Sequence, residues 1–319
     1  MGDVSQLRPA GAEPAAGAAA AGQAGARRFF GRLVREQPLG TAGGIVILLL
    51  VLVSIFADSL APYRFEEIHL RDRLQAPSAA YLLGTDHVGR DLLSRLIHGA
   101  RLSLSVGLAA TALTVVVAVL IGGTTGFFGG RLDLVTQRFV DAWMAFPGLL
   151  LLLTIMSIAG RGMLQIIIVL GVSGGIPASR VVRGAVLGVK ENVYFQAAQA
   201  IGSSRRRSLL RHVLPNIAAP IIIIFSINVG GVIMSEAALS FLGFGLPPDI
   251  PSWGGMLSRE GRQYMEIAPH LALWPGLCLT VVVYSLNMFG DAVRDLLDPR
   301  LRGRLGRYGA DATARPKAS

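Results

Sequence analysis

Charged residues are scarce in this sequence: Asp, Glu, Lys and Arg make up only 16% of its 319 residues. Soluble globular proteins carry about 25%, so the composition excludes an ordinary water-soluble fold. Hydrophobic residues make up 52% of the chain. Several apolar runs reach the ~20 residues that a helix needs to cross a bilayer. The sequence therefore predicts an all-α membrane protein with several crossings.

Cysteine and lysine are almost absent. The single cysteine, Cys278, cannot form a disulfide within the chain, and we expect it to be a small buried hydrophobe. Neither Lys190 nor Lys317 is preceded by Gly and followed by Ser or Thr, so the sequence has no Walker A phosphate loop. The five histidines lack zinc-ligand spacing. We therefore expect no catalytic residue, no metal site and no cofactor in this chain, with any ATP and Mg²⁺ bound by partner subunits.

Six predicted membrane spans divide the chain, at about 39–57, 102–126, 140–159, 163–182, 217–238 and 270–290. Residues 1–35 are predicted to be a disordered and then basic cytoplasmic segment, and 36–99 to hold the first span and an extracytoplasmic segment. Residues 100–292 hold the other five spans and a cytoplasmic loop at 190–216, and 293–319 form a basic cytoplasmic tail. In the second span Gly122, Gly126 and Gly130 recur every four residues, which predicts close approach of another helix.

The basic residues behind the net charge of +10 are unevenly divided between the two predicted sides of the membrane. With the N-terminus in the cytoplasm, 21 Lys and Arg fall on the inner side and 9 on the outer side. The positive-inside rule therefore predicts cytoplasmic N- and C-termini. Because topology accounts for the basic residues, and no basic patch is interleaved with aromatics, nucleic acid is not an expected partner.

The basic loop has the pattern of two short helices. Apolar and small residues recur at helical spacing in the first: Val193, Ala197, Ala200 and Ile201. Gly202 suits the turn, and Ser203 or Ser204 can cap the second helix. We expect Leu209, Leu210, Val213 and Leu214 to share one side of that second helix, Pro215 to end it, and Asn216 to cap the next span. A basic loop held at the bilayer surface by lipid headgroups is the alternative interpretation.

The spacing of this loop resembles the signature loop of ABC importer permeases, which reads Glu-Ala-Ala, three residues, Gly, nine residues, Ile, any residue, Leu-Pro. The matching positions are Ala197, Ala198, Gly202, Leu214 and Pro215. Gln196 replaces the usual Glu and His212 the usual Ile, so the ion pair that a Glu could make is lost. The resemblance implies that residues 196–215 form a coupling helix that docks on a cytoplasmic ATPase. A literal Glu-Ala-Ala at 236–238 lacks the following Gly and Leu-Pro.

Three further stretches, 83–107, 235–257 and 289–302, resemble the C-type permease of dipeptide, oligopeptide and nickel ABC importers. The resemblance implies a type I importer permease fold, with spans two to six as its core and an extra N-terminal helix. It also implies a bacterial inner membrane location and three kinds of partner: a homologous B-type permease, one or two ATPases, and an extracytoplasmic binding protein. A peptide is the expected substrate, with nickel or another small solute as the alternative.

The stretch 85–103 also predicts a local structure. Thr85 or Asp86 can cap a helix with an apolar stripe, in which Asp91 and Arg95 are spaced to pair at i,i+4. We expect this helix to lie in the outer interface before the second span. It would serve as an anchor or contact the binding protein.

Polar residues inside predicted spans are candidates for the pathway or for contacts between subunits, because burying them in the bilayer is costly. They are Glu236, Asn228 and Asn287. A secondary transporter that works alone predicts inverted repeats and ionisable pairs in the middle of its spans, which the sequence does not clearly show. A membrane protein with a purely structural or assembly role is the other alternative.

Overall fold

The computed structural model describes residues 31–247 and 249–297. The predicted tail at residues 1–30 and the end of the basic tail, 298–319, lie outside the described residues. Five helices are long and apolar enough to cross a membrane: α2 (Pro38–Ile55), α4 (Leu92–Phe128), α7 (Met163–Lys190), α11 (Ala218–Phe241) and α13 (His270–Leu297). The described part contains no strand, only an isolated bridge between Thr85 and Asp91.

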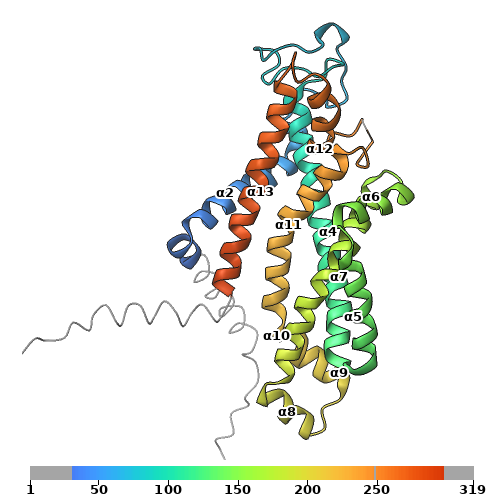
Figure 1. Cartoon of the computed structure of the whole chain (residues 1–319). Coiled ribbons are helices and arrows are strands. Elements are labelled where there is room, and N and C mark those ends of the chain that lie inside the picture. The colour runs from blue at the N-terminus through green and yellow to red at the C-terminus, as the bar shows by residue number, and fades with distance from the viewer. Residues whose placement is uncertain (1–30, 248, 298–319) are drawn as a thin grey trace, which may run out of the picture.

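Shorter helices connect the long ones. α5 (Gly130–Ala145) and α6 (Gly148–Ala159) follow α4, and α3 (Ala57–Leu60) and the 3-10 turn η1 (Leu70–Asp72) follow α2. Between α7 and α11 lie α8 (Val193–Ala200), α9 (Arg205–Arg207), the π-helix η2 (Ser208–Val213) and α10 (Leu214–Asn216). α12 (Trp253–Met256) and the π-helix η3 (Leu257–Gly261) precede α13. Figure 1 shows α12 near one end of the bundle and α8 at the other, so we call these the α12 end and the α8 end.

α4 and α7 pack closely along their length, and glycine allows that approach. A Cβ at Gly122 would lie 2.1 Å from the carbonyl oxygen of Ser179, and one at Gly126 would lie 2.9 Å from the Cβ of Val186. The predicted contact face is therefore confirmed for these two glycines. The prediction is wrong for Gly130, because α4 ends at Phe128, and Gly130 begins α5 with no described atom within 4 Å of where a Cβ would be.

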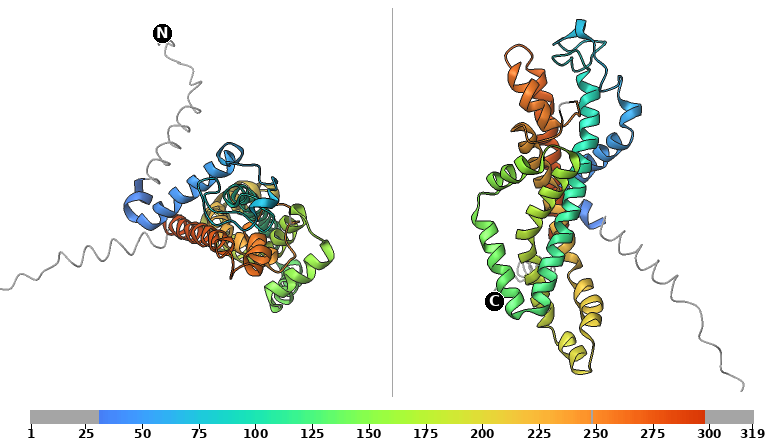
Figure 2. Two further views of the ribbon diagram at one scale, coloured as in Figure 1. Left: turned by 90° about the horizontal axis from the view of Figure 1, so that it is seen from above. Right: turned by 90° about the vertical axis from the view of Figure 1, so that its right-hand side faces the viewer.

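The third predicted span is not one straight helix. The chain runs as α5 and α6, which are bent by 95° at the break between them (Figure 2, right). Pro147 is the cause, since it restricts the residue before it to extended conformations: Phe146 has φ −84° and ψ 141°. Counting the bent pair as one crossing gives six spans. The start of α2 and the end of α13 lie together, where Gln37 Nε2 donates to Asp295 Oδ2 at 3.0 Å, as an even number of crossings requires.

The helix predicted to begin at Thr85 or Asp86 begins instead at Leu92 and continues as α4 to Phe128. Asp91 is its cap, because its carboxylate accepts from the backbone N–H of Ser94 at 2.8 Å. The predicted pairing of Asp91 with Arg95 is therefore wrong. With 37 residues, α4 is about 55 Å long, well above the ~30 Å of a hydrocarbon core.

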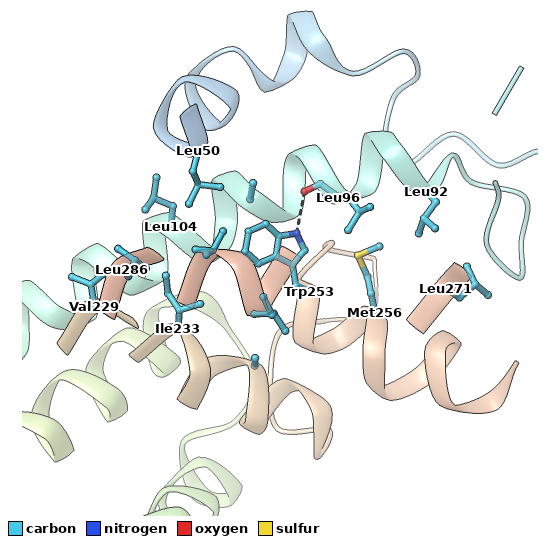
Figure 3. Close-up of a cluster of buried hydrophobic side chains, with 14 of the residues drawn as sticks. Leu50, Leu92, Leu96, Leu104, Val229, Ile233, Trp253, Met256, Leu271 and Leu286 are labelled. Atoms are coloured by element: carbon cyan, nitrogen blue, oxygen red, sulfur yellow. Dashed lines mark hydrogen bonds between the residues drawn. The ribbon is translucent and has the colours of Figure 1, made fainter. Parts of the chain in front are cut away.

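A hydrophobic cluster holds the α12 end together (Figure 3). Trp253 lies at its centre with 2% of its surface exposed, and its indole Nε1 donates to the carbonyl oxygen of Leu96 at 3.1 Å. The cluster draws side chains from α2, α4, α11, α12 and α13. It therefore fixes the connections at this end to the long helices.

Candidate functional site

α8 presents an apolar face to the surroundings. Val193 is 81% exposed and Ile201 is 87% exposed, and Ala197 and Ala200 between them are exposed as well. These four positions share one side of the helix, as the sequence predicted. Exposed apolar and small side chains that lie together on one side of a helix form a continuous patch, which is typical of a surface that binds another molecule.

The opposite side of α8 is anchored by one aromatic residue. Phe195 is 1% exposed and packs in a cluster with Val186 of α7, Val213 of η2 and Ile217. Asn192, at the start of α8, adds a link by donating from Nδ2 to the carbonyl oxygen of Gly188 at 3.0 Å. The exposed face is thus held at a fixed place relative to α7.

Gly202 makes the turn between the two short helices. Its φ of +83° lies in the left-handed region that favours glycine, and no atom lies within 4 Å of where a Cβ would be. Its N–H donates to Gln199 O, and the N–H of Ser203 donates to Ala198 O, both at 3.0 Å. Ser204 then caps the second helix by accepting from the N–H of Arg207 at 3.4 Å. The predicted turn and the predicted serine cap are both confirmed.

The second short helix differs from its prediction in three ways. Pro215 does not end it, because the chain widens into the π-helix η2 and continues through α10 to Asn216. In this wider turn the N–H of Leu214 donates to Leu209 O, five residues back. Pro215 has no N–H to donate, and the α-helical hydrogen-bond pattern is already altered at the residue before it. Asn216 does not cap α11 but donates to His212 O at 2.7 Å, and Leu210 is 49% exposed instead of packed with its neighbours.

Four arginines, Arg205, Arg206, Arg207 and Arg211, lie exposed along this second helix. None of them pairs with a carboxylate among the residues that the structure describes. Gln196 is also exposed, and its amide donates only to the backbone oxygen of Glu191, at 3.4 Å. The α8 end therefore combines an open apolar face with unneutralised positive charge.

Two ion pairs that the sequence did not reveal tie α5 to α7. Arg183 binds both carboxylate oxygens of Asp133 at 2.6 Å, and Arg180 binds Asp141. The Arg183–Asp133 pair is bidentate, a form that is among the stronger polar contacts. The two pairs join residues 50 and 39 positions apart, so no local spacing in the sequence points to them.

The structure separates the three polar candidates. Glu236 is fully buried within the chain, where its Oε1 accepts from Ser240 Oγ at 2.7 Å and its Oε2 accepts no hydrogen bond from the described residues. Asn287 is exposed, and a Cβ at Gly230 would lie 2.9 Å from its Oδ1, so it lies at the α11–α13 contact. Asn228 is partly buried and borders two cavities. Asn228 therefore lines an open space within the described part of the chain.

A buried ion network lies at the α12 end. Arg90 binds Asp86 at 2.5 Å and Glu260 at 3.0 Å, and Arg95 lies 3.7 Å from each of the same two carboxylates. Burial alone would raise the pKa of the Glu260 carboxyl, yet this pKa lies below its usual value because His87 and the two guanidinium groups stabilise the carboxylate.

Asp86, His87 and Glu260 bring donor atoms within 4.8 Å of one another, as a metal site would. The two arginines already supply the positive charge that a cation would bring, and they bind the same oxygens. The donor set therefore fits an ion network better than a metal ion.

The apolar spans indicate a multi-pass membrane protein, and comparison with known proteins gives its class as a transport permease. Residues 118–303 match the family described as "Binding-protein-dependent transport system inner membrane component". Residues 27–77 match the "N-terminal TM domain of oligopeptide transport permease C". The chain belongs to the first of these families, whose members are inner-membrane subunits of ABC importers.

Two relatives support the assignment along most of the chain. The glutathione transport system permease protein GsiD of Pectobacterium atrosepticum is 38% identical over 278 residues, which cover 86% of this chain and 91% of that protein. The protein of the same name from Escherichia coli is 38% identical over 276 residues, covering 86% and 90%. These relatives are transport permeases and not enzymes.

A solved structure adds support for the fold alone. A chain of the MetNI methionine ABC transporter, described in inward-facing conformations, aligns with a TM-score of 0.50 and 15% identity, over 64% of this chain and 96% of that one. The predicted permease fold is thus confirmed. As a permease of an ABC importer, the chain works with a second permease, an ATPase and a binding protein in general terms.

Proposed function

We propose that this chain is the C-type permease of an importer for small peptides, and that residues 191–216 are the segment that its ATPase binds. A homologous B-type permease would enclose the pathway with it, and an extracytoplasmic binding protein would deliver the solute. In this arrangement the α8 end is cytosolic, with both chain termini on that side, and the α12 end faces the binding protein.

The observation that carries the proposal is the exposed apolar face of α8, centred on Ala197 and backed by the buried Phe195. A small, smooth face allows a helix to enter a groove on another protein, while the anchor behind it transmits force to α7. Gln196 and Ala198 flank this face, and Gly202 fixes its orientation relative to the helix that carries Leu214 and Pro215. The neutral Gln196 means that docking relies on apolar contact and on the neighbouring arginines.

Peptides are the proposed substrate because the relatives at 38% identity bear the name of a glutathione transport system, and glutathione is itself a small peptide. The ligands retained by the binding protein that co-purifies with the complex identify the substrate. Retention of a di- or tripeptide supports the proposal, and retention of a nickel complex alone contradicts it.

Ala197→Asp tests the docking role in the complete importer reconstituted in liposomes. Burying an unpaired carboxylate in an apolar contact costs several kcal/mol, so we expect ATP-driven uptake to fall by about tenfold or more. Membrane insertion and protein yield should not change, since Ala197 is exposed in the chain itself.

Gln199→Asp is the matched control, because it adds the same charge to the same helix but on the opposite side, where Gln199 is also exposed. Its uptake should stay near that of the wild type. Wild-type uptake in Ala197→Asp, or equal losses in both variants, contradicts docking through this face. Labelling of Ala197→Cys by a membrane-impermeant thiol reagent from the outer side of intact cells contradicts the proposed orientation.

A further inference from the structure

Two cavities follow one another along the same side of α7 and α11. The first has a volume of about 460 Å³ and lies beside the bend between α5 and α6. The second has a volume of about 680 Å³, lies nearer the α8 end, and is bordered by Arg294 and Leu297 of α13. Both volumes fall within the ~300–1,000 Å³ of sites that enclose small molecules. Asn228 lines both cavities, so they meet at this side chain.

The two cavities form one continuous groove. On α7 the lining begins at Leu170, passes through Ser173 and Pro177, and continues through Val181 and Gly184 to Gly188. Steps of three and four residues keep these positions on one helix face. The 18 residue steps from Leu170 to Gly188 span about 27 Å. The groove is therefore nearly as long as the ~30 Å hydrocarbon core is thick.

The lining of the groove is mainly apolar, with a few hydroxyl and amide groups and no acidic side chain among its described residues. Ser173, Asn228 and Ser235 border the first cavity, whose described lining carries no charged side chain. In the second cavity Arg294 is the one charged residue of the described lining, and it lies in the last turn of α13. Hydroxyl and amide groups on a membrane helix face protein or water more often than lipid. This chemistry suits a solute that offers hydrogen bonds and no large net charge.

Asn228 is placed to contact such a solute at mid-depth. It is the eleventh residue of the 24-residue helix α11. Its Nδ2 donates to the backbone oxygen of Ile224 at 2.7 Å, which fixes the direction of the amide. Its Oδ1 accepts no hydrogen bond from the residues that the structure describes. The amide oxygen and the second N–H therefore remain able to bind a peptide group.

We propose that the α7–α11 groove is this chain's wall of the solute pathway, with Asn228 at the waist between an outer and an inner chamber. The solute is a zwitterionic peptide of two or three residues, recognised there by hydrogen bonds to its peptide groups and not by charge. The inference rests on the importer function proposed above and assigns it a specific path through the chain.

Water accessibility tests the groove in the assembled importer. In a Cys278→Ser background that retains uptake, Asn228→Cys should react with a charged, water-soluble methanethiosulfonate despite its depth in the membrane. Ile222→Cys and Met234→Cys are matched controls, because they lie six residues to either side of Asn228, on another face of α11, and are 47% and 57% exposed. We expect at least tenfold slower labelling at both controls.

Solute preference tests the role of the waist. Asn228→Asp places a carboxylate in the groove, so uptake of alanyl-lysine relative to alanyl-glutamate should rise by about fivefold compared with the wild-type ratio. The binding protein has its own preference between the two dipeptides. Dividing the uptake ratio of the variant by that of the wild type cancels this preference. Asn228→Leu should lower the uptake of alanyl-alanine while the ATPase and binding protein still co-purify.

The outcomes separate this inference from the function on which it rests. If wild-type importer transports peptides but Asn228→Cys labels as slowly as the controls, lipid or the second permease covers the groove and the inference is overturned. An unchanged alanyl-lysine to alanyl-glutamate ratio in Asn228→Asp overturns the waist role. If the wild-type complex shows no ATP-driven peptide uptake although Asn228→Cys labels rapidly, the peptide-importer function fails and the water-lined groove stands.

Discussion

At the α12 end, Arg95 is 2% exposed and its guanidinium lies against two buried carboxylates. At the α8 end, Arg205 and its neighbours are exposed, and no carboxylate of residues 31–247 or 249–297 pairs with them. Apolar side chains show the same contrast. Trp253 is buried at one end in a cluster to which five helices contribute, while Ile201 is 87% exposed at the other. The ion network and the Trp253 cluster of the first end are completed within the chain, although Ile267 is 76% exposed there. The apolar face and the arginines of the second end have no such cover among the described residues. Substitutions at the α12 end should therefore lower stability, and those at the α8 end should lower assembly.

The largest effect is expected from Trp253→Ala, which removes the centre of the α12-end cluster. The cavity and the lost hydrogen bond to Leu96 O should lower the free energy of unfolding by about 3–5 kcal/mol. Thermal unfolding of the detergent-purified protein measures the change. Tyr284→Ala, at a tyrosine that is 60% exposed, should shift stability by no more than about 0.5 kcal/mol. Equal stability losses in the two variants would contradict a central packing role for Trp253 at this end.

Glu260→Ala comes next, because it leaves Arg90 and Arg95 with one shared carboxylate where they had two. We expect a loss of about 3 kcal/mol, near the lower end for a broken buried pair, since Asp86 remains. Glu266→Ala removes an exposed carboxylate from the same connection and should have little effect. A stability loss shared by both variants would indicate a general charge effect.

The ion network also predicts a pH dependence. Since the pKa of the folded Glu260 is depressed below its ordinary value of 4.5, the stabilisation is fully present above that value and is lost as the pH falls through the folded pKa. Wild-type protein should therefore lose more stability on acidification below about pH 4.5 than Glu260→Gln does. Parallel stability–pH curves for the two proteins would contradict the network.

Substitutions at Gly202 should have a smaller and local effect. The left-handed backbone costs a residue with a Cβ about 1–2 kcal/mol, so Gly202→Ala should reduce the amount of ATPase that co-purifies. Gly202→Val should reduce it further, because a β-branched residue tolerates this conformation least. Gly202→Asn is the control that adopts the conformation most readily. ATPase recovery that is the same in all four proteins would show that the turn does not orient the docking face.

Neutralising the arginines should affect the stability of the chain least. Replacing Arg205, Arg206 and Arg207 together with Gln removes exposed charges without ion pairs, so unfolding should shift by no more than about 0.5 kcal/mol. If these charges contact the ATPase, the affinity of the wild type should fall with added salt and that of the variant should fall less. An identical salt dependence in both assigns the charges to a role away from the ATPase.

Much of the candidate coupling segment could be predicted from local sequence. Gly202 and the capping serine follow from backbone preferences that do not depend on the rest of the fold. The exposed face of α8 follows from helical spacing, although its exposure rests on Phe195, a residue the sequence did not single out. Pro215 was misjudged because proline usually ends a helix, and a π-helix that makes room for it depends on the packing of Val213 and Leu209.

Tertiary features were harder to predict. The apolar run through α5 and α6 has the length of one span, and hydropathy does not register the bend that Pro147 produces. Thr85, Asp86 and Asp91 are all good capping residues, so only the structure selects Asp91. The contact between Arg90 and Glu260 joins residues 170 positions apart, and no local sequence pattern predicts it.

The uninterrupted length of α4 joins the two ends that differ so strongly. Its first turn is tied to Trp253 through Leu96, and its last packs Phe127 into the cluster that contains Phe195. α7 and α13 contain Pro177 and Pro275, but α4 contains no proline at which to flex. For a stiff rod of about 55 Å, a rotation of about 5° at one tip sweeps the other through about 5 Å. A tilt of α4 at the α8 end would thus displace the α12 end by a distance comparable to one helical turn.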